Sequence, residues 1–127
     1  MRYFLSLCAA VTLATATACS NNDATSPSGS VVGNWSLHTL NGSPLPYTVN
    51  GSTALTAEVL YLNNDGSYTD VASYSNGTTF TEVGFYSVTN NLITFQDQTD
   101  NLQYTGSISG NVLTESNGSF TSVYQKN

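Results

Sequence analysis

Short turn signals recur throughout the chain after residue 40, and they limit the fold that it can adopt more than any other feature. Pairs of Asn, Asp and Gly interrupt the sequence at short intervals, and they include Asn41-Gly42, Asn50-Gly51, Asn76-Gly77, Gly110-Asn111 and Asn117-Gly118. Asn and Gly tolerate the positive φ angles that tight hairpins require. The runs between them are rich in Val, Thr, Tyr, Phe and Ile, which favour strands. This pattern predicts short antiparallel strands joined by hairpins.

The sequence predicts an all-β fold, a small antiparallel meander barrel of about eight strands. The expected strands are Gly33–Leu40, Leu45–Val49, Thr56–Leu62, Ser67–Tyr74, Thr79–Val88, Leu92–Gln96, Leu102–Ile108, Val112–Glu115 and Phe120–Gln125. No segment after Val31 has apolar residues that recur with a period of 3.6 over a long stretch. Helix is therefore expected only as one short turn within Ser52–Glu58.

Tyrosines alternate with small or apolar residues along several of these strands, and this alternation predicts the inner face. The tyrosines expected to point inward are Tyr68, Tyr74, Tyr86, Tyr104 and Tyr124. Gly84 and Gly106 share that face, where a curved sheet favours glycine. A barrel of this size either fills its interior with side chains or holds one small ligand, and both readings stay open. Asp70 shares the face of Tyr68 and would need a hydroxyl or cationic partner there.

The first 18 residues have the pattern of a secretory signal peptide. Arg2 precedes a short apolar run, and small residues follow it up to Ala18. The run is too short for a transmembrane helix, which needs about 20 apolar residues. Residues 1–18 are therefore expected to be removed on export.

Cys19 follows directly, and Ala16-Thr17-Ala18-Cys19 resembles the lipobox of bacterial lipoproteins. The resemblance implies cleavage before Cys19, acylation of this cysteine and a lipid anchor in the membrane. An ordinary signal peptide followed by an unmodified Cys19 is the alternative. Residues 20–30 contain no apolar residue larger than Ala and predict a disordered linker. The expected location is the bacterial cell envelope, on the outer membrane or facing the periplasm.

The charge balance excludes one class of partner and favours another. The formal net charge is −6, and Lys126 is the only lysine or arginine after Arg2. Binding to nucleic acid needs several basic side chains, so it is excluded. An acidic domain attracts basic proteins at low salt.

The segment "VVGNWSLHTLNGSPLP" resembles the opening of small bacterial lipocalin-like domains. Its residues Gly33-Asn34-Trp35 match the G-x-W signature of the first lipocalin strand. It also resembles the opening of META-type domains, so that alternative stays open. "LYLNNDGSYTD", "GFYSVTNNLITF" and "YTGSISGNVLTE" extend the lipocalin-like resemblance to the C-terminus. In that family an arginine of the last strand covers the tryptophan, and Lys126 is the only candidate here.

The lipocalin-like resemblance implies a lipid-anchored lipoprotein that binds a small hydrophobic ligand in its barrel. The candidate ligand-binding residues are Trp35, Tyr68, Tyr86, Tyr104 and Tyr124. The alternative function is a protein-interaction module of the cell envelope, or an inhibitor of a basic enzyme such as lysozyme. A monomer is expected in both cases.

No enzymatic activity is expected, because the sequence carries no catalytic motif. His38 is the only histidine and is expected on the outer surface of a strand. One histidine cannot build a usual zinc site, and no cofactor or other metal site is predicted. The carboxylates available for acid–base chemistry are Asp70, Glu82, Asp97, Asp100 and Glu115. They are expected on the solvated surface.

Overall fold

The computed structural model describes residues 31–127, and every regular element in that range is a strand. The predicted signal peptide, Cys19 and the linker at residues 20–30 lie outside the described residues. The strands are β1 (Gly33–Leu40), β2 (Ser43–Pro44), β3 (Tyr47–Asn50), β4 (Thr53–Leu62), β5 (Ser67–Tyr74), β6 (Thr79–Thr89), β7 (Leu92–Asp97), β8 (Gln103–Ser109), β9 (Val112–Ser116) and β10 (Thr121–Lys126). Over residues 31–127 no helix has the length and apolar character to span a membrane.

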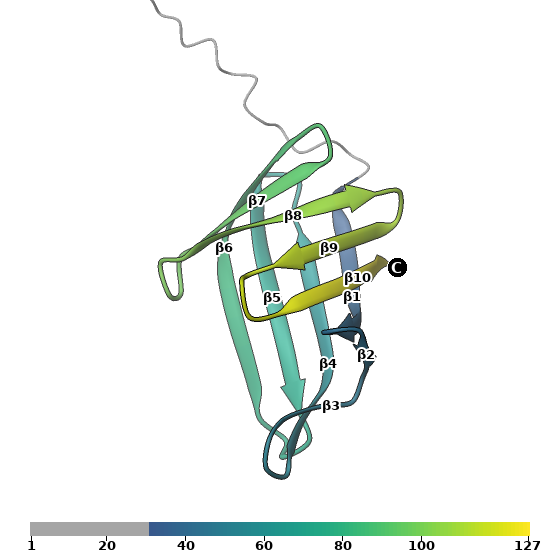
Figure 1. Cartoon of the computed structure of the whole chain (residues 1–127). Helices are drawn as coiled ribbons and strands as arrows, with labels where there is room; N and C mark the ends of the chain where they lie inside the picture. The colour runs from purple at the N-terminus through teal and green to yellow at the C-terminus, as the bar shows by residue number, and fades with distance from the viewer. Residues whose placement is uncertain (1–30) are drawn as a thin grey trace, which may run out of the picture.

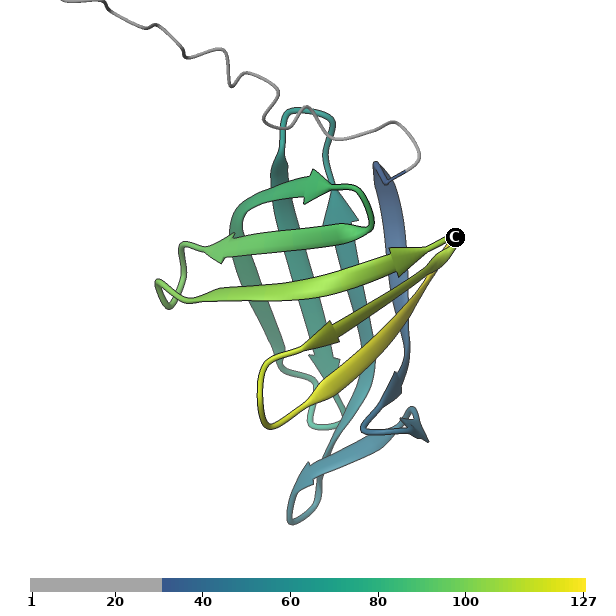
Figure 2. The same ribbon diagram turned by 45° about the horizontal axis from the view of Figure 1, so that its top comes forward.

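Eight of these strands close into an antiparallel barrel. From β4 to β10 each strand pairs with the next, and β1 pairs with both β10 and β4. Strands β4, β5 and β6 form one wall, which β8, β9 and β10 cross on the opposite side (Figures 1 and 2). The short strands β2 and β3 extend the sheet at one end, beside β1 and β4 respectively. The predicted meander barrel of about eight strands is confirmed.

Most strand boundaries follow the turn signals closely. Strands β1 and β5 have the predicted bounds, because an Asn-Gly turn follows each of them and an Asp-Gly turn precedes β5. The short helical turn predicted within Ser52–Glu58 is wrong. There β4 pairs with β3 and β5 across a bulge between Leu55 and Ala57, so strand partners satisfy its backbone. The single predicted strand Leu45–Val49 is also wrong, because this segment is divided between the loop after β2 and the strand β3.

The end of the barrel near residue 31 is filled by a core centred on Trp35, which is fully buried. Its indole Nε1 donates a hydrogen bond of 2.9 Å to the Val31 carbonyl oxygen. The Lys126 ammonium lies over the indole ring, 5.7 Å from its centroid, where the lipocalin-like resemblance implies a basic side chain. At Gly33 φ is +139°, and a Cβ there would lie 3.0 Å from Lys126 Cε. The G-x-W pattern therefore gives the lysine room to cover the tryptophan.

Gly84, on the inner face of β6, is required by close packing. A Cβ at this position would lie 2.2 Å from the backbone oxygen of Gln96 and 2.7 Å from Tyr68 Cε1. The neighbouring strand β7 would have to move. We expect Gly84→Ala to lower the free energy of unfolding by about 1–3 kcal/mol, the usual range for overpacking. Denaturant unfolding measures this, with Thr81→Ala on the exposed face of β6 as the control. Equal unfolding midpoints for the two variants would contradict the close packing.

Candidate functional site

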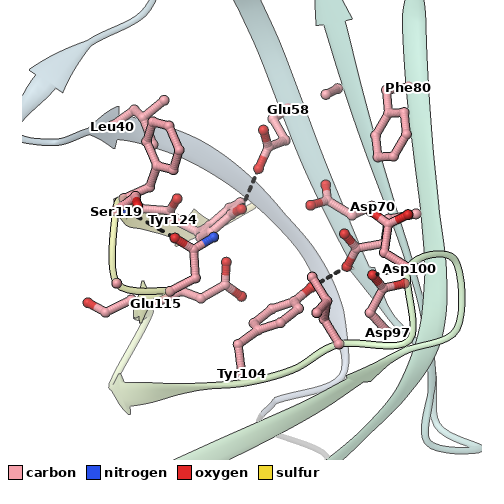
Figure 3. A pocket seen from close by; sticks show the side chains of 18 of the residues that line it. Leu40, Glu58, Asp70, Phe80, Asp97, Asp100, Tyr104, Glu115, Ser119 and Tyr124 are labelled. Carbon is pink, nitrogen blue, oxygen red and sulfur yellow. Dashed lines mark hydrogen bonds between the residues drawn. The ribbon is translucent and has the colours of Figure 1, made fainter. Parts of the chain in front are cut away.

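The other end of the barrel is open and leads into a cavity of about 1010 Å³. Almost every strand of the barrel contributes to its wall. The contributors include Leu40 from β1, Glu58 from β4, Asp70 from β5, Glu82 from β6, Tyr104 from β8, Glu115 from β9 and Tyr124 from β10 (Figure 3). Pockets that bind small molecules commonly have volumes of about 300–1,000 Å³, so this cavity is large enough for one.

Six of the eight acidic residues in the chain line this one cavity. They are Glu58, Asp70, Glu82, Asp97, Asp100 and Glu115. The expectation of a solvated surface position is wrong for Asp70, Glu82, Asp97 and Glu115, whereas Asp100 is exposed as expected. The chain therefore concentrates its carboxyl groups at the barrel mouth.

The strand period of two residues places these carboxylates inside. Glu58 lies two residues before the buried Leu60, and Glu115 lies two residues after the buried Leu113. Likewise Asp70 lies two residues after Tyr68 on the inner face of β5, and Glu82 lies two residues before Gly84 on the inner face of β6. Residues two apart point to the same face of a strand. Each carboxylate therefore points inward, one step closer to the mouth than a core residue of its own strand.

Tyrosine hydroxyls satisfy two of the carboxylates. The Tyr68 hydroxyl donates to Glu82 Oε1 at 2.6 Å, and the Tyr104 hydroxyl donates to the same oxygen. The two hydroxyl oxygens lie 3.1 Å apart. The Tyr124 hydroxyl donates to Glu58 Oε1 (Figure 3). These bonds fix the positions of Glu58 and Glu82 in the wall.

Asp70 and Glu115 have no such partners. Asp70 Oδ1 is buried and lacks a hydrogen-bond partner within the described chain. No hydrogen bond to the Glu115 side chain occurs among residues 31–127, although that side chain is largely enclosed. Figure 3 shows both side chains directed into the cavity. The Asp70 carboxyl group hydrogen-bonds with Glu58, but its Oδ1 has no partner, and the wall gives Glu115 none, so both groups keep hydrogen-bonding capacity toward the cavity.

Burial and mutual repulsion raise the pKa values of three carboxyl groups in the cavity. Burial first, and then the charges of Glu58, Glu115 and Glu82, raise the pKa of Asp70 to about 9. Burial, with the charges of Glu58 and Glu82, raises the pKa of Glu115 to about 8. Burial also raises the pKa of Glu58, which the Tyr124 hydrogen bond opposes. Each of the four carboxyl groups thus lies within electrostatic reach of the other three.

Asp97 has a separate, structural role. It is 1% exposed, and its Oδ1 accepts a hydrogen bond of 2.6 Å from the Thr99 amide. Its Oδ2 accepts one of 3.2 Å from the Asp100 amide. These bonds hold the turn between β7 and β8, as Asp side chains commonly do.

The rim of the cavity carries exposed apolar side chains. Val49, Phe80, Leu102 and Phe120 line the cavity and are 44%, 48%, 58% and 45% exposed. Apolar groups gathered at an opening commonly mark a binding surface. The cavity therefore combines an acidic interior with an apolar rim.

The five aromatic residues proposed from the sequence divide between the two ends of the barrel. Tyr104 and Tyr124 line the cavity. Tyr68 is buried below it and contacts the cavity wall through its hydroxyl bonds. Trp35 and Tyr86 belong to the buried core, and Tyr86 donates a hydrogen bond of 2.7 Å to the Asn63 carbonyl oxygen near the filled end. The interior is thus filled at one end and hollow at the other.

His38 is exposed on β1, as predicted, and does not line the cavity. In the part of the chain that the structure describes, no three His, Cys, Asp or Glu side chains are grouped so that they could hold a metal ion.

Comparisons with known proteins identify the fold. No family model matches this chain, and no curated protein matches it. A solved lipocalin-like protein from Bacteroides uniformis is similar with a TM-score of 0.55 and 16% identity, over 78% of this chain and 100% of that one. A solved uncharacterized protein from Bacteroides eggerthii gives a TM-score of 0.52 and 12% identity, over 76% and 98% of the two chains. At these identities the similarity shows that the fold is a lipocalin-like barrel.

Proposed function

We propose that this lipocalin-like barrel is a binding module that holds one small organic molecule in its open end. The observation that carries the proposal is the cavity of about 1010 Å³, whose wall is built from strands around the whole barrel. Ligand pockets combine apolar walls with a few well-placed polar groups. Here Leu40, Leu55 and Phe80 supply apolar surface between the carboxylates.

The wall is formed in advance of binding. Continuous strand pairing holds the backbone, and the bonds from Tyr68 and Tyr104 to Glu82 hold the side chains. A preformed site loses less conformational entropy when a ligand binds. This rigidity supports specific binding of a molecule that fits the cavity.

Binding accounts for the cavity better than catalysis. Its lining contains no histidine, cysteine or lysine. Hydroxyl nucleophiles such as Ser119 and Ser122 need an adjacent base to react, and neither serine hydroxyl is hydrogen-bonded to a carboxylate of the lining. We therefore assign the carboxylates to recognition.

The module belongs, in this proposal, to an exported bacterial protein held in the cell envelope by acyl chains on Cys19. The lipobox-like segment Ala16-Thr17-Ala18-Cys19 supports this anchor. Mass spectrometry of the protein from its native membrane fraction tests it. The expected product begins at Cys19 and carries acyl chains, and an unmodified Cys19 would contradict the anchor.

Filling the cavity is expected to abolish binding. Ala72→Phe and Ser122→Phe each add a ring to a residue that lines it. Native mass spectrometry of the intact protein, after incubation with a lipid and metabolite extract of the source cell, should show an added mass on the unaltered protein. We expect that mass to disappear in both variants.

The matched control is Thr81→Phe, which adds the same ring on the outer face of β6. This variant should keep the added mass. An added mass that persists in all three variants would place the ligand outside the cavity and contradict the proposal.

A second candidate function is supported by the exposed rim. Val49, Phe80 and Phe120 surround an acidic opening, which is a surface suited to a basic protein such as lysozyme. The experiment in the next subsection distinguishes this candidate from the first.

A further inference from the structure

The negative charge of the cavity is not balanced by its own wall. Glu58, Asp70, Glu82 and Glu115 enter it from four different strands, and no lysine, arginine or histidine lines it. The only lysine of residues 31–127 extends over Trp35 near the filled end. Acidic groups with perturbed pKa values that gather in one cleft make that cleft a candidate functional site.

The open acceptors indicate which chemical group is missing. Tyrosine hydroxyls satisfy Glu58 and Glu82, whereas the wall provides no donor for Asp70 Oδ1 or for Glu115. A protonated carboxyl group can also donate a hydrogen bond, whereas an ionised one only accepts. A ligand that binds Asp70 and Glu115 in their ionised forms must donate several hydrogen bonds to them, as ammonium and guanidinium groups do.

The remaining wall suits the same kind of ligand. The aromatic rings of Tyr74, Tyr104 and Tyr124 line the cavity beside the carboxylates. The faces of such rings attract cations. Further out, Phe80 and Phe120 provide apolar surface for a hydrocarbon body.

We propose that the cavity binds a small amphipathic organic cation, with its ammonium or guanidinium group among Glu58, Asp70, Glu82 and Glu115 and its apolar body at the rim. This inference rests on the proposed function and narrows it to one ligand class. It replaces the purely hydrophobic ligand expected from the sequence with one that carries a positive charge.

Titration calorimetry with three probes of one shape tests the charge requirement. The probes are 2-phenylethylamine, the neutral 2-phenylethanol and the anionic 3-phenylpropanoate. We expect the amine to bind at least about tenfold more tightly than the alcohol, since a charged hydrogen bond contributes more than a tenfold factor. The anion should show no binding.

Charge-removing variants locate the site. Asp70→Asn and Glu115→Gln should each weaken binding of the amine about tenfold while leaving binding of the alcohol unchanged. Asp65→Asn is the matched control, because it removes one charge in the turn between β4 and β5, outside the cavity lining. It should leave the affinity for the amine unchanged.

Cation binding also favours the ionised forms of Asp70 and Glu115, and it should therefore release protons near pH 7.5. Calorimetry in two buffers of different ionisation enthalpy measures this release. The other titratable side chains that line the cavity are Glu58, Glu82, Asp97, Asp100, Tyr74, Tyr104 and Tyr124. The release should be smaller in Asp70→Asn and unchanged in Asp65→Asn.

The outcomes separate this inference from the function on which it rests. If the amine and the alcohol bind with equal affinity, and if Ala72→Phe abolishes binding of both, the proposal of a cationic ligand is overturned. The proposal of a binding module then still holds. If no probe and no extract component binds, both proposals fail. Binding of lysozyme in the absence of any amine binding would overturn the inference in favour of the second candidate function. Displacement of the amine by equimolar Ca²⁺ or Mg²⁺ would overturn it in favour of a metal site.

Discussion

Replacing Trp35 by alanine is expected to lower the free energy of unfolding by about 3–5 kcal/mol, the largest loss that we expect from any single side chain. The indole is 0% exposed and lies at the centre of the filled end. Its removal leaves a cavity, frees the Val31 carbonyl oxygen and removes the ring below Lys126. Equilibrium unfolding in urea measures the loss.

Two further variants divide this effect into its parts. Lys126→Met keeps most of the side-chain volume and removes only the cation over the ring, which contributes about 0.5–1 kcal/mol at an accessible site. Trp35→Phe keeps an aromatic ring and loses the hydrogen bond to Val31, so an intermediate loss is expected. If Trp35→Ala cost no more than Lys126→Met, the filled end would not be the main source of stability.

Stability is expected to fall as the pH rises from about 4 to about 9, the reverse of common acid denaturation. The folded state raises the pKa of Asp70 from 3.8 to about 9 and that of Glu115 from 4.5 to about 8. Between about pH 4 and pH 9 the folded protein binds more protons than the unfolded chain, so the free energy of unfolding is larger at low pH. This stabilisation is fully present below about pH 4 and is lost as the pH passes through about 8 to 9.

The measurement is the thermal midpoint from pH 5 to pH 9, together with two variants. Asp70→Asn removes a group that must take up a proton on folding at pH 8, so it should raise the midpoint at that pH and reduce its dependence on pH. A gain of about 1 kcal/mol corresponds to roughly 4–8 °C in a domain of this size. Asp65→Asn should not reproduce this change, because Ser67 lowers the pKa of Asp65 and its effect has the opposite sign. A midpoint that rises steadily with pH would contradict the repulsion inside the cavity.

The barrel could be predicted because its determinants are local. Asn41, Gly42, Gly77 and Gly118 all have positive φ, as the hairpin pattern requires. The alternation in β5 correctly placed Tyr68 and Ala72 inside. The segment after Gly51 could not be predicted locally, because its conformation depends on pairing with β3 and on a bulge opposite β5.

The acidic cavity does not follow from the usual reading of a sequence, for a different reason. Charged residues are usually solvated, and this rule places Glu82 and Glu115 on the surface. Their spacing from Gly84 and Leu113 already placed them on inner faces, and this signal was available in the sequence. Their proximity to Asp70 depends on how distant strands meet across the barrel, and the period of a single strand does not contain that information.

The position of the filled end has a consequence for how the protein presents its opening. Val31, where the described chain begins, is buried beside Trp35 and does not line the cavity. The first described residue therefore lies at the filled end of the barrel, on the side of the tryptophan. The start of the described chain leaves the opening uncovered, so a molecule can enter the acidic cavity without displacing it.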